Sequence, residues 1–387
     1  MNVCRTCLIP DTRPDTHFED GRCSACRSYE DRPNIDWGKR KQELLELLDR
    51  HHGRCIVPSS GGKDSTAQVL TLLELGADVT IVTATTCHLT DIGRRNIDNL
   101  ARYARTIEVS PNKTVRAKLN RIGLEVVGDI SWPEHMSIFR TPFKMALALD
   151  IPLIMYGENP QNQYGSPPGA EDAREMTQRW VSEFGGFLGL RPQDVVGMMG
   201  ITKLDMADYM PPDEAALQQK GVEAHFLGQY LPWDSHENAA KARAAGMETG
   251  RPCIANWWDH ENLDNAQTGI HDWFGYLKYG YGRAAAQLSV DVRRGSIHLE
   301  DARIRLAEMD GVFPYWYGGV QIQEVLDRIG MTEQQFMDCA KMYVSPAMFD
   351  RNLKWGERLP HEFSRADRRR LECRVSRAPD ESTENRR

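Results

Sequence analysis

The sequence predicts an α/β fold with a doubly wound parallel sheet, a small cysteine-rich module before it and a mostly helical part after it. Between residues 54 and 156, short apolar runs alternate with amphipathic helical patterns, which is typical of strands joined by crossover helices. Two C-x₂-C pairs precede this region. The 387 residues suffice for a large core. We divide the chain into a cysteine module at 1–30, an α/β domain at 31–230, a helical C-terminal region at 231–360 and a disordered tail at 361–387.

The composition is that of a soluble globular protein, with 41% apolar and 27% charged residues. No apolar run approaches the roughly 18 residues that a membrane span needs, and the N-terminus lacks a signal-peptide pattern. We therefore expect a cytoplasmic protein. Its net charge of −7 argues against a broad nucleic-acid surface. The nine cysteines fit reduced thiols better than a disulfide framework.

The four N-terminal cysteines have the spacing of a zinc site. Cys4 and Cys7 form one C-x₂-C pair, and Cys23 and Cys26 form the second. Two such pairs can place four thiolates around Zn²⁺ and leave no open position, so the ion would be structural. The polar segment 1–30 could hardly build a core without metal. A redox dithiol pair is the alternative.

The remaining elements follow from apolar periodicity. Strands are predicted at 55–58, 78–84, 106–109, 152–156 and 222–228. Helices are predicted at 36–52, 67–76, 91–104, 112–122, 141–150, 237–245 and across 295–355. In the loosely patterned insertion at 159–212, the loop at 162–169 is either a substrate lid or a plain surface loop. The arginine-rich tail is predicted to be disordered.

Residues 59–65, SSGGKDS, form the turn between the first strand of the sheet and its helix. Gly61 and Gly62 let the backbone approach a ligand and direct N–H groups toward it, and the helix N-terminus favours an anion such as phosphate. Ser60 and Ser65 add hydroxyl groups, Lys63 adds a positive charge, and Asp64 adds a carboxylate suited to Mg²⁺. The spacing is not that of a Walker A loop. An ordinary Ser/Gly-rich turn is the alternative.

The motif resembles the PP-loop, S-G-G-x-D-S, of ATP pyrophosphatases, which have the adenine nucleotide α-hydrolase-like fold. This resemblance implies that residues 60–65 hold the phosphates of ATP. In such a sheet, ligands bind at the carboxyl ends of the strands. Thr85 and His88 follow the second strand, where the adenosine would lie; for His88, a surface loop is an equal alternative. Glu158 and Asn159 follow the strand at 152–156, and Glu158 is a candidate to bind Mg²⁺ or to orient a substrate.

The chain up to about residue 350 also resembles the bacterial N-acetyl sugar amidotransferase family. The resemblance rests on the four cysteines, residues 60–65, and the stretches YGEN at 156–159, LPWD at 231–234 and LKYGYGRA at 277–284. Members of that family are associated with acetamidino sugars of lipopolysaccharide O-antigen or with nonulosonic acids.

The resemblance implies a reaction and roles for its residues. The carbonyl oxygen of an N-acetyl sugar would attack the α-phosphorus of ATP·Mg²⁺, and ammonia would then displace AMP. Lys63, Asp64, Glu158 and Lys278 are the expected catalytic residues. Lys278 and Arg283 are candidates to hold a phosphate or a sugar carboxylate, although the aromatic and cationic residues around them could equally be core and solvated surface.

Two further interpretations concern the ammonia source and the reaction class. None of Cys55, Cys87, Cys253, Cys339 and Cys373 lies in a G-x-C-x-G elbow, and residue 2 is asparagine. We therefore expect a separate glutaminase, of the type found in histidine biosynthesis. A PP-loop tRNA thiolase is the competing enzyme class; the acidic charge and the absence of a second downstream C-x₂-C pair argue against it. A nucleotide-binding scaffold is the non-enzymatic alternative.

Overall fold

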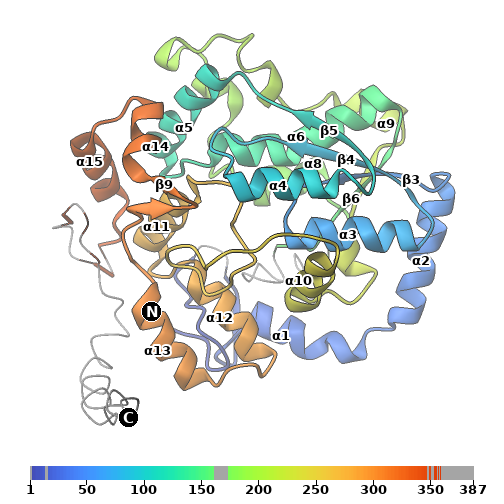
Figure 1. Cartoon of the computed structure of the whole chain (residues 1–387), viewed down its shortest axis with the longest axis horizontal. Helices are drawn as coiled ribbons and strands as arrows, with labels where there is room; N and C mark the ends of the chain where they lie inside the picture. Colours follow the sequence, from blue (N-terminus) through green and yellow to red (C-terminus); the bar gives the residue numbers. More distant parts are fainter. Residues whose placement is uncertain are drawn as a thin grey trace, which may run out of the picture.

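The computed structural model describes residues 2–13, 16–160, 173–346, 348–349, 353–354, 356 and 358 (Figure 1). The loop at 162–169, which the sequence analysis leaves as either a lid or a plain surface loop, lies outside the described residues, and so does the tail at 361–387, for which disorder is predicted.

A five-stranded parallel sheet forms the centre of the fold, as predicted. Its strands lie in the order β5-β4-β3-β6-β7. Their bounds are β3 Arg54–Pro58, β4 Asp78–Ala84, β5 Arg105–Val109, β6 Leu153–Tyr156 and β7 Glu223–Phe226. The chain first winds outward from β3 to β5 and then returns to β6 on the other side of β3. A ligand crevice is expected beside β3, because the direction of winding reverses there.

Helices cover both faces of this sheet, so the doubly wound prediction holds. The bounds around the sheet are α2 Trp37–Arg50, α3 Lys63–Glu74, α4 Asp91–Leu100, α5 Lys113–Val127, α6 Trp132–Leu149, α8 Gln178–Phe184, α9 Glu214–Gln219 and α10 Ser235–Ala244. In β3, Val57 packs with the apolar faces of α2 and α3, whereas its neighbour Ile56 packs with those of α5 and α6. Successive residues of a strand point to opposite faces, and here both faces are buried.

Helix α6 begins nine residues earlier than the sequence predicts, at Trp132 instead of residue 141. Pro142 lies next to the predicted start, and proline is favoured in the first turn of a helix and disfavoured inside it. The structure accommodates it in the interior. Proline has no N–H for the carbonyl of Ile138, and the hydroxyl of Tyr156 on β6 lies 3.4 Å from that carbonyl oxygen as a substitute donor.

The C-terminal region forms two further apolar clusters. Its helices are α11 Thr268–Tyr279, α12 Arg283–Arg293, α13 Leu299–Met309, α14 Ile322–Ile329 and α15 Glu333–Tyr343. Helices α11, α14 and α15 share one core. Helices α12 and α13 pack instead against the N-terminal cysteine module, which contains β1 Phe18–Glu19, β2 Arg22–Cys23 and α1 Ser24–Asp31 (Figure 1). The stretch 295–355 is not helical throughout, because the short pair β8 Trp316–Tyr317 and β9 Val320–Gln321 interrupts it.

Among the described residues, none of the helices combines the length and the apolar character needed to cross a membrane.

Candidate functional site

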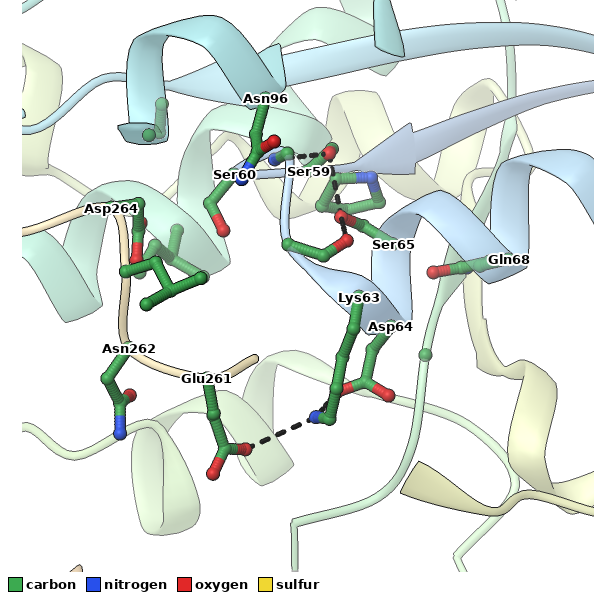
Figure 2. Close-up of a pocket in the computed structure, with 18 of the residues that line it drawn as sticks. Ser59, Ser60, Lys63, Asp64, Ser65, Gln68, Asn96, Glu261, Asn262 and Asp264 are labelled. Carbon is green, nitrogen blue, oxygen red and sulfur yellow. Dashed lines mark hydrogen bonds and ion pairs between the residues drawn. The ribbon is translucent and has the colours of Figure 1, made fainter. Parts of the chain in front are cut away.

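A cavity of about 450 Å³ lies at the carboxyl ends of β3, β4 and β6. The turn before α3, the adjoining ends of the strands, helices α4 and α6, and the distant segment 260–264 contribute to its walls. Figure 2 shows Glu261 and Asp264 of that segment across the cavity from the turn. It is lined by Pro58, Ser59, Ser60, Gly61, Gly62, Lys63, Asp64, Ser65, Gln68, Val82, Ala84, Thr86, Gly93, Asn96, Ile138, Pro142, Tyr156, Gly157, Glu158, Pro160, Met247, His260, Glu261, Asn262, Leu263 and Asp264. All six residues of the predicted PP-loop, 60–65, are in this lining.

The turn before α3 is held by its own side chains. The hydroxyl of Ser59 accepts a hydrogen bond from the backbone N–H of Gly61 at 2.9 Å and donates to the hydroxyl of Ser65 at 2.8 Å. Gly61 has φ +79°, and a Cβ there would lie 2.7 Å from the backbone nitrogen of Ile97 on α4. Only glycine therefore fits at this position, for both conformational and steric reasons.

Lys63 is a buried cation at the floor of the cavity, with only 3% of its side chain exposed. Its Nζ lies 2.5 Å from a carboxylate oxygen of Asp64 and 3.3 Å from Oε1 of Glu261. Burial by itself would lower the pKa of Lys63, but the two carboxylates outweigh it and raise the pKa above its ordinary value. Lys63 is therefore charged at neutral pH, and its ammonium is fixed in direction.

Glu158 contributes a second carboxylate to the cavity, next to Asp64. Burial and the charge of Asp64 raise the pKa of Glu158 to about 7, despite the opposing effect of Lys63. The other oxygen of Asp64 accepts a hydrogen bond from Asn238 of α10 at 3.0 Å. Two neighbouring carboxylates of this kind are hard oxygen donors suited to Mg²⁺, and a bound cation would favour the ionised form of Glu158.

The segment 256–264 supplies residues that are not among the predicted catalytic or ligand-binding residues. Glu261 accepts a hydrogen bond from the buried Gln287 of α12 at 2.6 Å, and Lys63 and Arg283 lower its pKa to about 2 against the effect of burial. His260 stacks on Trp258 with ring centroids 5.2 Å apart. Burial lowers the pKa of His260, so its imidazole is neutral at pH 7. The polar cluster at 261–264 is visible in the sequence, but its role is not, because its partners are distant in the chain.

Three predicted ligand-binding residues do not line the cavity. The hydroxyl of Thr85 lies 2.8 Å from that of Ser110 beyond β5, while the adjacent Thr86 does line the cavity. His88 is half-buried, and burial and Arg328 lower its pKa to about 4. Asn159 is 1% exposed and directs its amide nitrogen to the carbonyl oxygen of Ala173 at 3.5 Å.

Lys278 and Arg283 also lie outside the cavity lining. Lys278 donates to the carbonyl oxygen of Val127 at 3.4 Å, and burial lowers its pKa. Arg283, at the start of α12, pairs with Asp272 at 2.8 Å. The positive charge of Arg283 nevertheless helps to lower the pKa of Glu261.

The four N-terminal cysteines come together as predicted. All four are buried, and their sulfur atoms lie within 4.8 Å of one another. The Sγ atoms of Cys4 and Cys26 are 3.8 Å apart, and those of Cys7 and Cys23 are 3.7 Å apart. Around a zinc ion with bonds of about 2.3 Å, the edge of a sulfur tetrahedron is about 3.8 Å. The cluster therefore has the geometry of a tetrahedral metal site rather than that of a disulfide.

Comparison with known proteins adds a family for the C-terminal region. Residues 254–360 match the family model described as "LPS biosynthesis protein WbpG-like, C-terminal domain". This match supports the predicted resemblance over the C-terminal region. The matched region begins just before the segment that closes the cavity, so it contributes His260 and Glu261 to a wall opposite the turn before α3.

The remaining comparisons are less informative. No curated protein matches the chain. Among solved structures, that of NMN synthetase from Francisella tularensis is similar over 54% of this chain and 96% of its own, with 12% identity. Its TM-score of 0.25 is too low to support any argument.

Proposed function

We propose that this protein is a cytoplasmic, ATP-dependent synthetase that converts the N-acetyl group of a sugar into an acetamidino group for a surface polysaccharide or glycan. The amide oxygen attacks the α-phosphorus of ATP, forming an O-adenylyl imidate and releasing pyrophosphate. Ammonia then adds to the imidate carbon, the C–O bond to AMP breaks, and an acetamidine remains. An amide oxygen is a poor leaving group. Adenylation converts it into part of AMP, which leaves readily, and this is why the reaction needs ATP.

One observation carries the proposal: the WbpG-like region and the PP-loop turn share one cavity through the ion pair between Glu261 and Lys63. The family match associates the C-terminal region with lipopolysaccharide biosynthesis. The turn, with its helix N-terminus, glycines and serine hydroxyls, is suited to phosphates. A sugar-modifying, ATP-consuming enzyme accounts for both halves of the cavity.

The residues of the cavity then have distinct tasks. The N–H groups and hydroxyls of residues 60–65 would bind the β- and γ-phosphates, and Lys63 would stabilise the negative charge that develops on the departing pyrophosphate. Asp64 and Glu158 would hold Mg²⁺, whose charge supports phosphate binding when it is bound. His260, neutral and close to Lys63, is a candidate to accept a proton from the incoming ammonia.

Ammonia is proposed to come from a separate glutaminase, since no cysteine of the chain lies in a glutaminase motif. Zn²⁺ is proposed to occupy the four-cysteine cluster as a structural ion.

Pyrophosphate release from ATP tests the function. The purified protein would be assayed with ammonium and a panel of free and nucleotide-linked N-acetyl sugars, and in parallel with bulk tRNA and a sulfur donor. We expect release of pyrophosphate and AMP that depends on one of the sugars. Asp64→Ala should reduce the rate about 100-fold or more, whereas Asp338→Ala, which removes an exposed carboxylate on α15, should leave it unchanged.

Each other result would overturn the proposal. Release that requires tRNA would assign the protein to the thiolases. ATP binding without pyrophosphate release under any substrate would make it a nucleotide-binding scaffold. Full glutamine-dependent activity without a partner would contradict the separate glutaminase.

A further inference from the structure

A second cluster of potential metal ligands lies outside the cavity, between the α5–α6 connection and α11. Asp129 is at its centre, with 5% of its side chain exposed. Its Oδ1 accepts hydrogen bonds from the backbone N–H of Ser131 at 2.8 Å and from Nδ1 of His271 at 2.7 Å. Its Oδ2 faces Nδ1 of His135 at 3.5 Å. The three ligand atoms lie within 4.8 Å of one another.

The backbone fixes the position of this carboxylate. Gly128 ends α5 in the left-handed conformation with φ 64°, and the backbone N–H of Asp129 then donates to the carbonyl oxygen of Gly123 at 3.1 Å. A Cβ at position 123 would lie 2.6 Å from the carbonyl oxygen of Asp129, so the two segments are in close contact. Asp129 therefore projects from a tightly packed turn and does not depend on the histidines for its position.

The two histidines approach Asp129 from different helices. His135 belongs to α6 and His271 to α11, and their rings meet edge to face with centroids 5.3 Å apart. Both side chains are about three-quarters buried, with 25% and 28% of their surface exposed. Nδ1 of His135 is buried without a hydrogen-bond partner among the described residues. A buried nitrogen directed at a carboxylate but too distant to bond it is an unsatisfied polar atom.

We propose that Asp129, His135 and His271 form a second metal site, which binds a divalent transition ion such as Zn²⁺. Two imidazole nitrogens and one carboxylate oxygen are a donor set that suits zinc, and an ion among them would bind Nδ1 of His135 in place of its long contact of 3.5 Å with Asp129. Binding replaces the proton that Nδ1 of His271 now shares with Asp129. Three protein ligands leave a fourth position open for water or a substrate oxygen, unlike the closed cysteine site.

The site adjoins the cavity through helix α6. His135 precedes Ile138 by three residues and Pro142 by seven, and both of these line the cavity. Residues with this spacing lie on one face of a helix. His135 therefore lies on the face of α6 that lines the cavity, although the existence of the metal site does not depend on the proposed function.

Lys278 provides a charge against which the proposal can be tested. Its positive charge helps to lower the pKa of Asp129, and its ammonium donates to the carbonyl oxygen of Val127. A cation bound at Asp129 would be repelled by Lys278, so Lys278→Met should bind the ion more tightly. A purely hydrogen-bonded Asp–His pair predicts no such gain.

Zinc titration of the full chain, loaded beforehand with the zinc of the cysteine cluster, tests the site. Calorimetry and metal analysis after dialysis should show a second equivalent of Zn²⁺ that a thiol-blocking mercurial does not release, since only the first is held by thiolates. Asp129→Asn and His271→Gln should weaken this second binding by about 100-fold or more, because loss of a direct ligand should exceed the roughly 10–100-fold cost of losing an outer-shell partner. His298→Gln, an exposed histidine before α13, should bind as the wild type does.

His135→Gln serves as a second ligand variant if Asp129→Asn fails to fold. One equivalent of zinc in the wild type, all of it released by the mercurial, would overturn the proposal. Unchanged affinity for the second equivalent in both histidine variants would do so as well.

Discussion

At the scale of single residues, the charge and the position of the Lys63 ammonium depend on its neighbouring carboxylates. An isolated buried ammonium is costly, and here two carboxylates, one adjacent in sequence and one distant, offset that cost. Asp64 follows it directly, while Glu261 lies 198 residues later (Figure 2). The arrangement holds a positive charge where phosphates would bind and prevents it from turning toward solvent.

The pair between Lys63 and Glu261 should make stability sensitive to acid. The folded pKa of Glu261 is about 2, below its ordinary value of 4.5. The stabilisation is thus fully present above pH 4.5 and is lost as the pH falls toward 2. Glu261→Gln should lower the free energy of unfolding at pH 7 by on the order of 2 kcal/mol, and the difference from the wild type should shrink below pH 4.5.

Urea unfolding at pH 7, 5 and 3.5 would measure this difference. Glu300→Gln, which removes an exposed carboxylate on α13, is the matched control. Its free energy of unfolding should equal that of the wild type at each pH. A constant difference between Glu261→Gln and the wild type across this range would contradict the assigned ion pair.

At the scale of elements, the packing of the turn before α3 against α4 determines the shape of the phosphate-binding backbone. Gly61→Ala would place a methyl group 2.7 Å from the backbone nitrogen of Ile97 and would strain φ. We expect a displacement of the turn and a fall in kcat/KM for ATP of about 100-fold, the effect of a misplacement of roughly 1 Å.

Gly76 provides a control that separates strain from contact. It has φ +84°, but a Cβ there would meet no atom within 4 Å. Gly76→Ala should therefore cost about 1–2 kcal/mol of stability and leave catalysis unchanged. Equal kcat/KM values for the two variants would show that contact with α4 does not shape the turn.

The sheet and its helices could be predicted because their signals are local. Apolar periodicity placed β3 to β7, and the glycine pair marked the turn before α3. The first half of α6 was missed because Pro142 is a local signal for a helix start, whereas the hydroxyl that compensates for it belongs to Tyr156 on another element. Local patterns contain no information about such a partner.

The candidate site could be predicted only where it is contiguous in sequence. Residues 60–65 and Glu158 were found from strand ends, and the cavity contains them. Glu261, His260 and Asn238 were not assigned to this site, because tertiary contacts alone bring them to Lys63 and Asp64. Lys278 was predicted to hold a phosphate or a sugar carboxylate, but it lies outside the cavity lining, where the charge of Asp129 acts on it.

At the scale of the whole molecule, helix α12 connects the cysteine module to the cavity. Ser289 on this helix accepts a hydrogen bond from the backbone N–H of Leu8, between the cysteine pairs, at 3.1 Å. Half a turn earlier, Gln287 donates to Glu261 at 2.6 Å and accepts from the backbone N–H of Trp257 at 2.6 Å. The N-terminal module is thus packed on the helix that positions the partner of Lys63.

Loss of zinc should therefore affect the ATP site as well as the module. Cys7→Ser removes one thiolate from the closed shell, and the binding energy of the metal is part of the folding energy of the segment. We expect loss of bound zinc, a lower Tm and an ATP affinity reduced about tenfold, or roughly 1.4 kcal/mol, because α12 loses its support.

Cys87→Ser, which changes a cysteine outside the cluster, should keep both the zinc and the ATP affinity. Metal analysis, thermal unfolding and ATP titration on both variants would measure these effects. If Cys7→Ser lost its zinc but bound ATP with unchanged affinity, the module would stabilise only itself, and the connection through α12 would carry no coupling between the two sites.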